Sequence, residues 1–167
     1  MAIRPIVRYP DNALRTVCAP IVRFDDDLRA LADDLLETMR AAPGVGITGP
    51  HIGELGSIAV IQLAGDDRVR VYVNPVIEEF SSETQRHVEG SVSMPGITDE
   101  IERPAHIRVR YQTLDGTQAV ENASGFLATC IQHEVDQLGG IFWLQRLSRL
   151  KRERAIRRWE KLRRVTP

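Results

Sequence analysis

The chain has 167 residues, of which 43% are hydrophobic and 27% are charged, and its formal net charge is −1 at pH 7. This composition excludes a disordered chain and fits one globular domain with a sizeable core, which we expect to span residues 1–167. The N-terminus has no apolar signal region and no stretch approaches the roughly 18 apolar residues of a membrane span, so we expect a cytoplasmic protein with no membrane or DNA partner.

The first predicted element is an amphipathic helix of about four turns. Asp25, Asp26 and Asp27 offer an N-cap and negative charge in the first turn. The dipeptide Pro43-Gly44 ends the helix. The apolar positions between them recur at helical spacing: Leu28, Leu31, Leu35 and Met39.

The middle of the chain is predicted to be antiparallel sheet. Residues 57–63 and 69–73 have the composition of strands, and Gly65-Asp66-Asp67 between them is typical of a hairpin turn. Residues 107–111 alternate apolar and polar side chains, and a second turn signal follows at 114–117.

Two further helices are predicted. Ser124 is a candidate cap for a helix that Gly139-Gly140 closes, and a last helix is expected at about 148–164. Residues 146–167 hold ten Lys and Arg against two Glu, so a weakly acidic body ends in a basic helix. The fold class is α+β, with antiparallel β-sheets packed around a central motif helix and helices at both ends.

The central helix carries an altered metal-binding motif. Residues 132–137 read Gln-His-Glu-Val-Asp-Gln, which is His-Glu-x-x-His with its last histidine replaced by Gln137. Side chains four apart share one helix face, so two histidines there can hold a metal while the glutamate polarises its bound water. The amide of Gln137 is a weak ligand. Either the metal is lost, or another residue supplies the missing nitrogen.

Three segments together resemble the bacterial peptide deformylases, and the resemblance extends over nearly the whole chain. Residues 44–51, Gly-Val-Gly-Ile-Thr-Gly-Pro-His, match the family's Gly-x-Gly-x-Ala-Ala-x-Gln. Residues 89–93, Glu-Gly-Ser-Val-Ser, match Glu-Gly-Cys-Leu-Ser, and residues 132–138 match Gln-His-Glu-x-Asp-His-Leu. The resemblance implies the deformylase fold and the removal of N-formyl groups from nascent peptides.

The resemblance also implies site roles, position by position. One divalent metal, Fe or Zn, would be held at His133, Ser91 and Gln137, with Glu134 as general acid/base and His51 and the backbone of Val92 stabilising the oxyanion. Ser91 stands where the family has its thiolate, Gln137 where it has a histidine, and His51 where it has a glutamine. A serine hydroxyl stays protonated near neutral pH, so we expect a large loss of metal affinity and weak or absent deformylase activity.

The substitutions also allow a rebuilt site. The family's glutamine and second histidine have exchanged places, with His at 51 and Gln at 137. We hypothesise, as an alternative to metal loss, that His51 supplies the missing metal-ligating nitrogen and that the amide of Gln137 takes the oxyanion role, with Glu134 as base. This alternative predicts an active metal-dependent deformylase or amide hydrolase.

A third alternative is a non-catalytic module that binds peptides or the ribosome. By resemblance, the partners are an N-formylated or other peptide in the cleft and ribosomal RNA at the basic C-terminal helix, since clustered positive charge attracts phosphates. Gly44, Gly46 and Gly49 fit no phosphate-loop fingerprint, and the resemblance favours close backbone approach to a bound peptide there.

Other candidate polar residues have plainer readings. Glu89 either hydrogen-bonds a site residue or braces a turn. His87 and His106 are expected to face solvent, and Cys130 is expected to be a small buried hydrophobe although it lies one turn before His133. Cys18 and Cys130 are too few for a disulfide framework, so both are expected to be free thiols.

Overall fold

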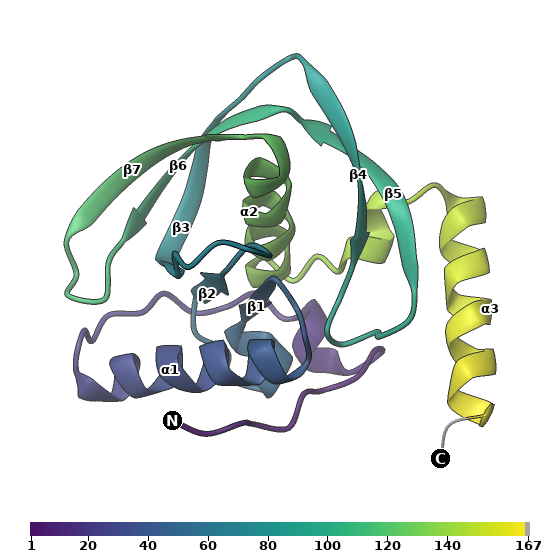
Figure 1. The fold of residues 1–167 in the computed structure, drawn as a ribbon, viewed down its shortest axis with the longest axis horizontal. Helices are drawn as coiled ribbons and strands as arrows, with labels where there is room; N and C mark the ends of the chain where they lie inside the picture. Colours follow the sequence, from purple (N-terminus) through teal and green to yellow (C-terminus); the bar gives the residue numbers. More distant parts are fainter. Residues whose placement is uncertain (166–167) are drawn as a thin grey trace.

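The computed structural model describes residues 1–165 (Figure 1); residues 166 and 167, which the single-domain prediction includes, lie outside the described part. Within that range, no helix is both long enough and apolar enough to cross a membrane. The elements, in chain order, are η1 (Asn12–Arg15), α1 (Asp26–Ala41), β1 (Gly46–Thr48), η2 (Gly49–Ile52), β2 (Ile58–Ile61), β3 (Arg70–Phe80), β4 (Thr84–Gly90), β5 (Thr98–Pro104), β6 (His106–Gln112), β7 (Gln118–Ser124), α2 (Gly125–Leu138), η3 (Trp143–Arg146) and α3 (Arg149–Val165).

Helix α2 lies at the centre of the molecule. A five-stranded sheet has the order β1-β2-β3-β6-β7, and β4 and β5 form a separate two-stranded sheet. All of these strand pairs are antiparallel. In Figure 1, the larger sheet and the β4–β5 pair lie on either side of α2, and α1 lies below. The predicted α+β architecture around a central helix is confirmed.

The predicted first helix forms as α1. The Asp25 carboxylate caps it by accepting a hydrogen bond from the Leu28 amide at 3.1 Å. Its buried face packs on β1 and β2 in one apolar cluster, which removes hydrocarbon from water and so stabilises the packing. The buried members of that cluster are Leu28, Ala32, Leu35, Met39, Ile47, Ile52, Ile58, Val60 and Val73.

Helix α3 contacts the body through a narrow stripe. Within its described residues, Ala155 and Trp159 are the buried ones, whereas Leu150 is 54% and Leu162 41% exposed. Leu150 and Leu162 therefore contribute little to the contact between α3 and the body. The indole Nε1 of Trp159 donates to the carbonyl oxygen of Tyr9 at 3.1 Å, which ties α3 to the N-terminal segment.

The sheet differs from the prediction in two places. Strand β3 extends to Phe80, well beyond the predicted end at residue 73, and the β4–β5 hairpin was not predicted. Both additions are rich in charged residues, because only one face of each strand is covered. The predicted turn at 65–67 does join β2 to β3, and Gly65 there has a φ of +76° that suits glycine.

Candidate functional site

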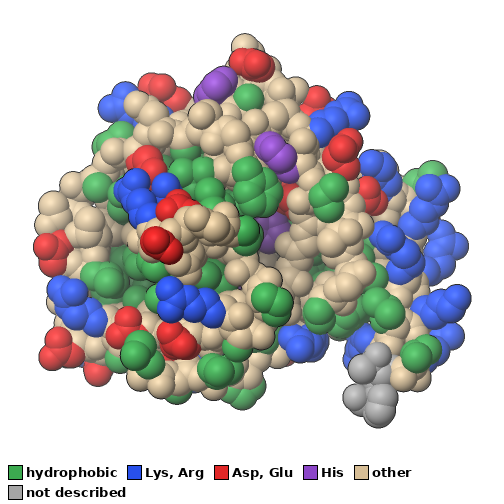
Figure 2. Space-filling view, viewed as in Figure 1, with side chains coloured by type: hydrophobic (Ala, Val, Ile, Leu, Met, Phe, Trp, Pro, Cys, Tyr) green, Lys and Arg blue, Asp and Glu red, His purple; other side chains and the backbone are tan. Residues whose placement is uncertain are grey.

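A cavity of about 340 Å³ lies beside α2 and is bounded by β1, β4 and the segment after β4. On the face drawn in Figure 2, histidine and hydrophobic side chains gather over α2 and β4. Six of the predicted site residues line the cavity and come from four separate parts of the chain: Gly46, His51, Ser91, Val92, His133 and Glu134. The structure therefore brings most of the predicted site together.

His133 is held by a carboxylate on β4. Its Nδ1–H donates to Glu89 Oε1 at 2.8 Å, which leaves Nε2 as the nitrogen on the side of Glu134, 3.8 Å from that residue's Oε1. Burial alone would lower the pKa of His133, but the hydrogen bond to Glu89 and the nearby carboxylates outweigh it and raise the pKa. Of the two readings of Glu89, the contact with a site residue is the observed one.

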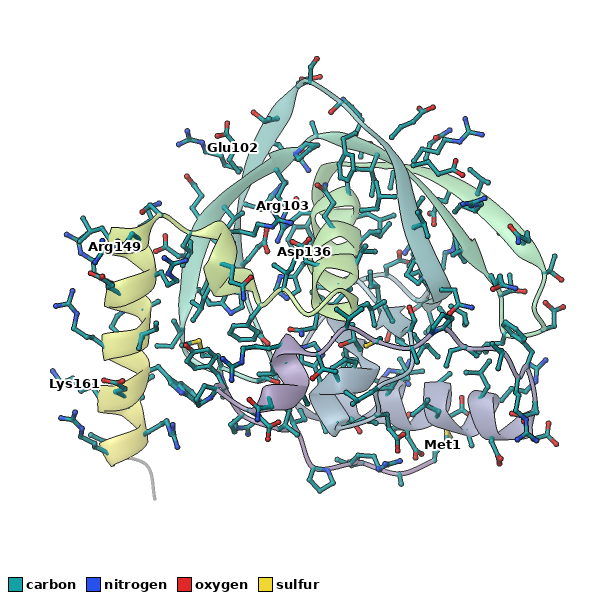
Figure 3. All side chains as sticks on the ribbon, turned by 180° about the vertical axis from the view of Figure 1, so that it is seen from behind. Met1, Glu102, Arg103, Asp136, Arg149 and Lys161 are labelled. Atoms are coloured by element: carbon teal, nitrogen blue, oxygen red, sulfur yellow. The ribbon has the colours of Figure 1, made fainter. Side chains whose placement is uncertain are left out.

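Arg103 anchors Glu89 from β5. Its guanidinium donates to both carboxylate oxygens of Glu89, at 2.6 and 3.0 Å, and to Asp136 Oδ2 at 2.9 Å. Figure 3 shows Arg103 on β5 and Asp136 on α2 next to each other. Burial alone would raise the pKa of Glu89, but the hydrogen bonds from His133 and Arg103 hold it at about 2. Glu89 is therefore ionised and fixes the orientation of His133.

Glu134 is buried against the backbone of β1. A Cβ at Gly46 would lie 2.9 Å from Glu134 Oε1, so the glycine makes room for this carboxylate. The other oxygen, Oε2, is buried and has no hydrogen-bond partner among the described residues. Burial raises the pKa of Glu134 to about 7, although His133 acts in the opposite direction. Such a carboxyl can accept or release a proton near neutral pH.

His51 occupies the short helix η2 and is 1% exposed. Its Nδ1 accepts a hydrogen bond from the Thr48 amide at 2.9 Å, and the Thr48 hydroxyl oxygen lies at the same distance. Its Nε2 is buried without a partner in the described part of the chain. Burial and the neighbouring His133 lower the pKa of His51 to about 3, so the ring is neutral.

Ser91 and Val92 form the turn after β4. The Ser91 hydroxyl oxygen accepts from the Ser93 amide at 3.1 Å, and the Val92 carbonyl accepts from Arg8 at 3.1 Å. The Ser91 hydroxyl oxygen is thus already the acceptor of a turn hydrogen bond.

Gln137 differs from the expectation. It lies one helical turn after His133, but it is absent from the part of the cavity wall that the described residues form. Its amide Nε2 instead donates to the carbonyl oxygen of Leu14 at 2.8 Å. A buried amide that satisfies a buried carbonyl is costly to redirect, so the structure does not bring Gln137 into the predicted ligand or oxyanion position.

The residues present do not fit the metal site that the resemblance implies. Residues 1–165 contain no group of three or more His, Cys, Asp or Glu side chains placed to hold one ion. His133 contributes an imidazole, Ser91 offers a hydroxyl, and Gln137 is engaged elsewhere. A structural or catalytic zinc site uses at least three strong protein ligands, so this set lacks the required donors.

The remaining histidines and cysteines are placed as follows. His106 is exposed, as predicted, and pairs with Glu83 at 3.2 Å. The prediction for His87 is wrong: its Nδ1 lies 3.0 Å from the Thr129 hydroxyl and its ring packs edge-on against Phe126, because β4 runs alongside α2.

Cys130 is buried in the core as predicted and also lines the cavity, where burial raises its thiol pKa to about 12. Both cysteines are free.

Two functional residues were missed from the sequence. Arg103 gave no signal, since a single arginine in a charged strand looks like any solvated residue. Thr48 did carry a signal, because a threonine three residues before a polar side chain is the spacing of a capping box.

The sequence and the fold are both similar to those of one family of known proteins. The family model "Polypeptide deformylase" matches residues 3–153. The chain is 58% identical to a "Peptide deformylase-like" protein of Agrobacterium fabrum over 98% of this chain and 99% of that one. It is 46% identical to a "Peptide deformylase" of Phenylobacterium zucineum over 96% and 97% of the two chains. The crystal structure of a peptide deformylase from Legionella pneumophila superposes with a TM-score of 0.92 at 36% identity, covering 98% of this chain and 97% of that one.

Proposed function

The chain belongs to the polypeptide deformylase family, and we propose that it binds N-acylated peptide ends in the family's cleft without metal-dependent deformylation. The single observation that carries this proposal is the loss of the ligand set. Of the three family ligand positions, only His133 has kept its side-chain type, and the described residues hold no three-ligand group. Family membership alone does not establish the reaction.

The lining of the cavity supports a binding role. Its wall combines apolar side chains with the polar groups of the site, which suits a side chain next to a polar peptide end. Apolar members of the wall are Val45, Val88, Val92, Pro95 and Phe126. A binding role therefore needs no residue that the chain has lost.

The experiment measures metal content and formate release on the same preparation. Protein purified anaerobically, without added metal, is analysed by elemental mass spectrometry and then assayed with formyl-Met-Ala-Ser. We expect far less than one metal per chain and no formate release above that of the Glu134→Ala variant. One metal per chain together with turnover that depends on Glu134 would overturn the proposal.

One observation favours a second candidate, a metal-dependent amide hydrolase built on His51 and His133. The buried Nε2 of His51 has no partner in the described structure and lies on the same cavity as His133 and Glu134. This candidate predicts bound metal that is lost in both His51→Ala and His133→Ala variants. Metal-free wild-type protein would exclude it.

We also propose that α3 contacts ribosomal RNA, whatever the chemistry of the cleft. Its basic side chains are mostly exposed, whereas Trp159 holds the helix to the body. Three of them share one face at helical spacing and have no ion pair in the described structure: Arg154, Arg157 and Lys161.

Ribosome co-sedimentation at increasing salt tests this contact. Replacing Arg154, Arg157 and Lys161 by Gln should weaken binding and flatten its salt dependence, because fewer counterions are released. Arg110→Gln on β6, an exposed arginine outside α3 that pairs with Glu78, is the surface control, and Glu134→Ala should leave ribosome binding unchanged. Equal binding by the triple variant and the wild type would contradict the proposal.

A further inference from the structure

The two ring nitrogens of His51 have opposite surroundings. Nδ1 faces the Thr48 amide at 2.9 Å, whereas Nε2 is buried, has no partner among the described residues, and belongs to a ring that lines the cavity. A buried polar atom without a partner costs free energy, so a cavity that keeps one is prepared for a ligand or a water.

Thr48 determines which nitrogen carries the proton. The backbone N–H of Thr48 can only donate a hydrogen bond. Because Thr48 is fully buried, no water can replace His51 Nδ1 as the acceptor of that N–H. Nδ1 must therefore present its lone pair to Thr48. A neutral imidazole has one N–H, and here that N–H is on Nε2. The low pKa of His51 is consistent with a neutral ring.

A nitrogen that carries a proton is a hydrogen-bond donor and not a metal ligand. To bind a metal through Nε2, the ring would have to move its proton to Nδ1, where it would oppose the Thr48 N–H. The hypothesis that His51 supplies the missing metal-ligating nitrogen is therefore in conflict with this hydrogen bond. The histidine at position 51 therefore supplies a hydrogen-bond donor. It does not supply the metal ligand that is missing at position 137.

The second partnerless atom in the cavity is an acceptor. Glu134 Oε2 is buried and without a partner in the described structure, and Glu134 lines the same cavity as His51. A carboxyl group keeps at least one oxygen that can accept a hydrogen bond in either protonation state. The cavity wall thus contains one donor, His51 Nε2–H, and one carboxyl group that can accept.

The surrounding charges favour a neutral ligand. Glu89 and Arg103 are paired, and Arg103 and Arg146 both contact Asp136. His133 lies next to both Glu89 and Glu134. An anionic ligand would be buried beside the Glu134 carboxyl, which is unfavourable. A secondary amide offers one acceptor and one donor on separate atoms without charge, so it can satisfy both groups of the cavity.

We infer that the cavity binds the secondary amide of an N-acylated peptide end without metal, with its carbonyl oxygen accepting from His51 Nε2–H and its N–H donating to Glu134. This inference rests on the proposed function and assigns the groups that recognise the ligand. His51 and Glu134 then form a binding pair that needs neither Ser91 nor Gln137.

The first test is the proton position in wild-type protein. Long-range ¹⁵N–¹H correlation spectra of histidine-labelled protein distinguish the two neutral tautomers. We expect His51 to carry its proton on Nε2 and to keep this spectrum when Zn²⁺ is added. A proton on Nδ1, or Zn²⁺-induced loss of the Nε2–H signal, would overturn the inference.

The second test is calorimetric binding of N-acetyl-Met-Ala-Ser in the presence of EDTA. We expect binding by wild-type protein and at least tenfold weaker binding of Met-Ala-Ser, which has a charged amine in place of the amide. His51→Leu should weaken binding of the acetylated peptide about fivefold to tenfold, the usual loss for one neutral hydrogen bond. His51→Gln retains an N–H donor and should recover most of that loss. Equal affinity in both variants would overturn the inference.

The outcomes separate the two proposals. Stoichiometric metal and formate release would refute the proposed function, whatever the state of His51. Metal-free, inactive protein that binds the acetylated peptide equally well with Leu and Gln at position 51 would refute only the role of His51. Because the tautomer is measured in the wild type, a variant that fails to fold does not leave the inference untested.

Discussion

His133 and Glu89 are joined by a hydrogen bond of 2.8 Å between Nδ1 and Oε1, which links the central helix to the β4–β5 hairpin. The carboxylate of Glu89 is in turn held by Arg103 from the neighbouring strand. In a metal enzyme such a carboxylate orients a ligating imidazole. In this chain Glu89 joins His133 and Arg103 in one buried network, so the contact has a structural role that does not depend on a bound metal.

Removing the Glu89 carboxylate should destabilise the fold strongly. Glu89→Ala leaves Arg103 buried with only Asp136 and leaves His133 without its partner, which should cost roughly 3–5 kcal/mol of unfolding free energy. Glu100→Ala is the control, because Glu100 on the adjacent strand is exposed and lies 3.8 Å from Arg86. It should change stability by less than about 0.5 kcal/mol. Urea denaturation measures the unfolding free energy of both variants. Similar losses would show that the buried Glu89–Arg103 pair stabilises the fold no more than an exposed glutamate does.

Burial of Glu134 should reduce stability as the pH rises. Its pKa is raised from 4.5 to about 7, so the folded state binds the proton more tightly than the unfolded state does. The contribution of Glu134 to the unfolding free energy is fully present below pH 4.5, and it is lost as the pH rises through about 7. Glu134→Gln removes the titration and should be more stable than wild type by up to about 3 kcal/mol at pH 8, with little difference at pH 4.5.

Denaturation of both proteins at several pH values tests this prediction. The pKa of Glu89 in the folded protein is about 2, so Glu89 stays ionised there from pH 4.5 to 8. The Glu134 carboxylate raises the pKa of His133, so the difference between the two proteins reports this pair together. Glu102→Gln, at an exposed site on β5, is the surface control. A constant offset between Glu134→Gln and wild type from pH 4.5 to 8 would contradict the burial of an ionised carboxylate.

Gly46 and Glu134 should be energetically coupled. An added Cβ at position 46 would lie 2.9 Å from Glu134 Oε1, so Gly46→Ala should cost about 1–3 kcal/mol by displacing a buried side chain. In a Glu134→Ala background the obstruction is gone, and the same substitution should cost less than about 0.5 kcal/mol. The double-mutant cycle by urea denaturation gives the coupling. Equal costs in the two backgrounds would mean that the strand itself, and not the carboxylate, requires glycine.

The sequence predicted those parts of the site in which the residues lie close together along the chain. His133 and Glu134 on one helix, and Ser91 and Val92 in one turn, follow from short motifs, and the structure places all four on one cavity. What the sequence did not predict depends on contacts distant along the chain. The side chain of Gln137 is directed by the carbonyl of Leu14, 123 residues away, and helical periodicity carries no information about that acceptor.

The hydrogen-bonding direction of His51 shows the same limit. The exchange of His and Gln between positions 51 and 137 suggested a transferred metal ligand, because residue type alone does not say which ring nitrogen is free. The answer depends on the backbone amide of Thr48, which points at Nδ1. Arg103 was missed for a related reason, since its strand is mostly exposed and only the fold shows that this arginine is buried.

Restoring the family's ligands should restore metal binding, and it should do so without His51. Ser91→Cys together with Gln137→His supplies a thiolate and a second imidazole beside His133, so we expect metal content to rise from far below one to about one per chain. Each single substitution should bind metal more weakly, because the set then still lacks one strong ligand. Elemental mass spectrometry after anaerobic purification measures this. Adding His51→Leu to the double variant should leave its metal content unchanged if Nε2 of His51 is a donor. Loss of the metal on that addition would instead show that His51 is itself a ligand.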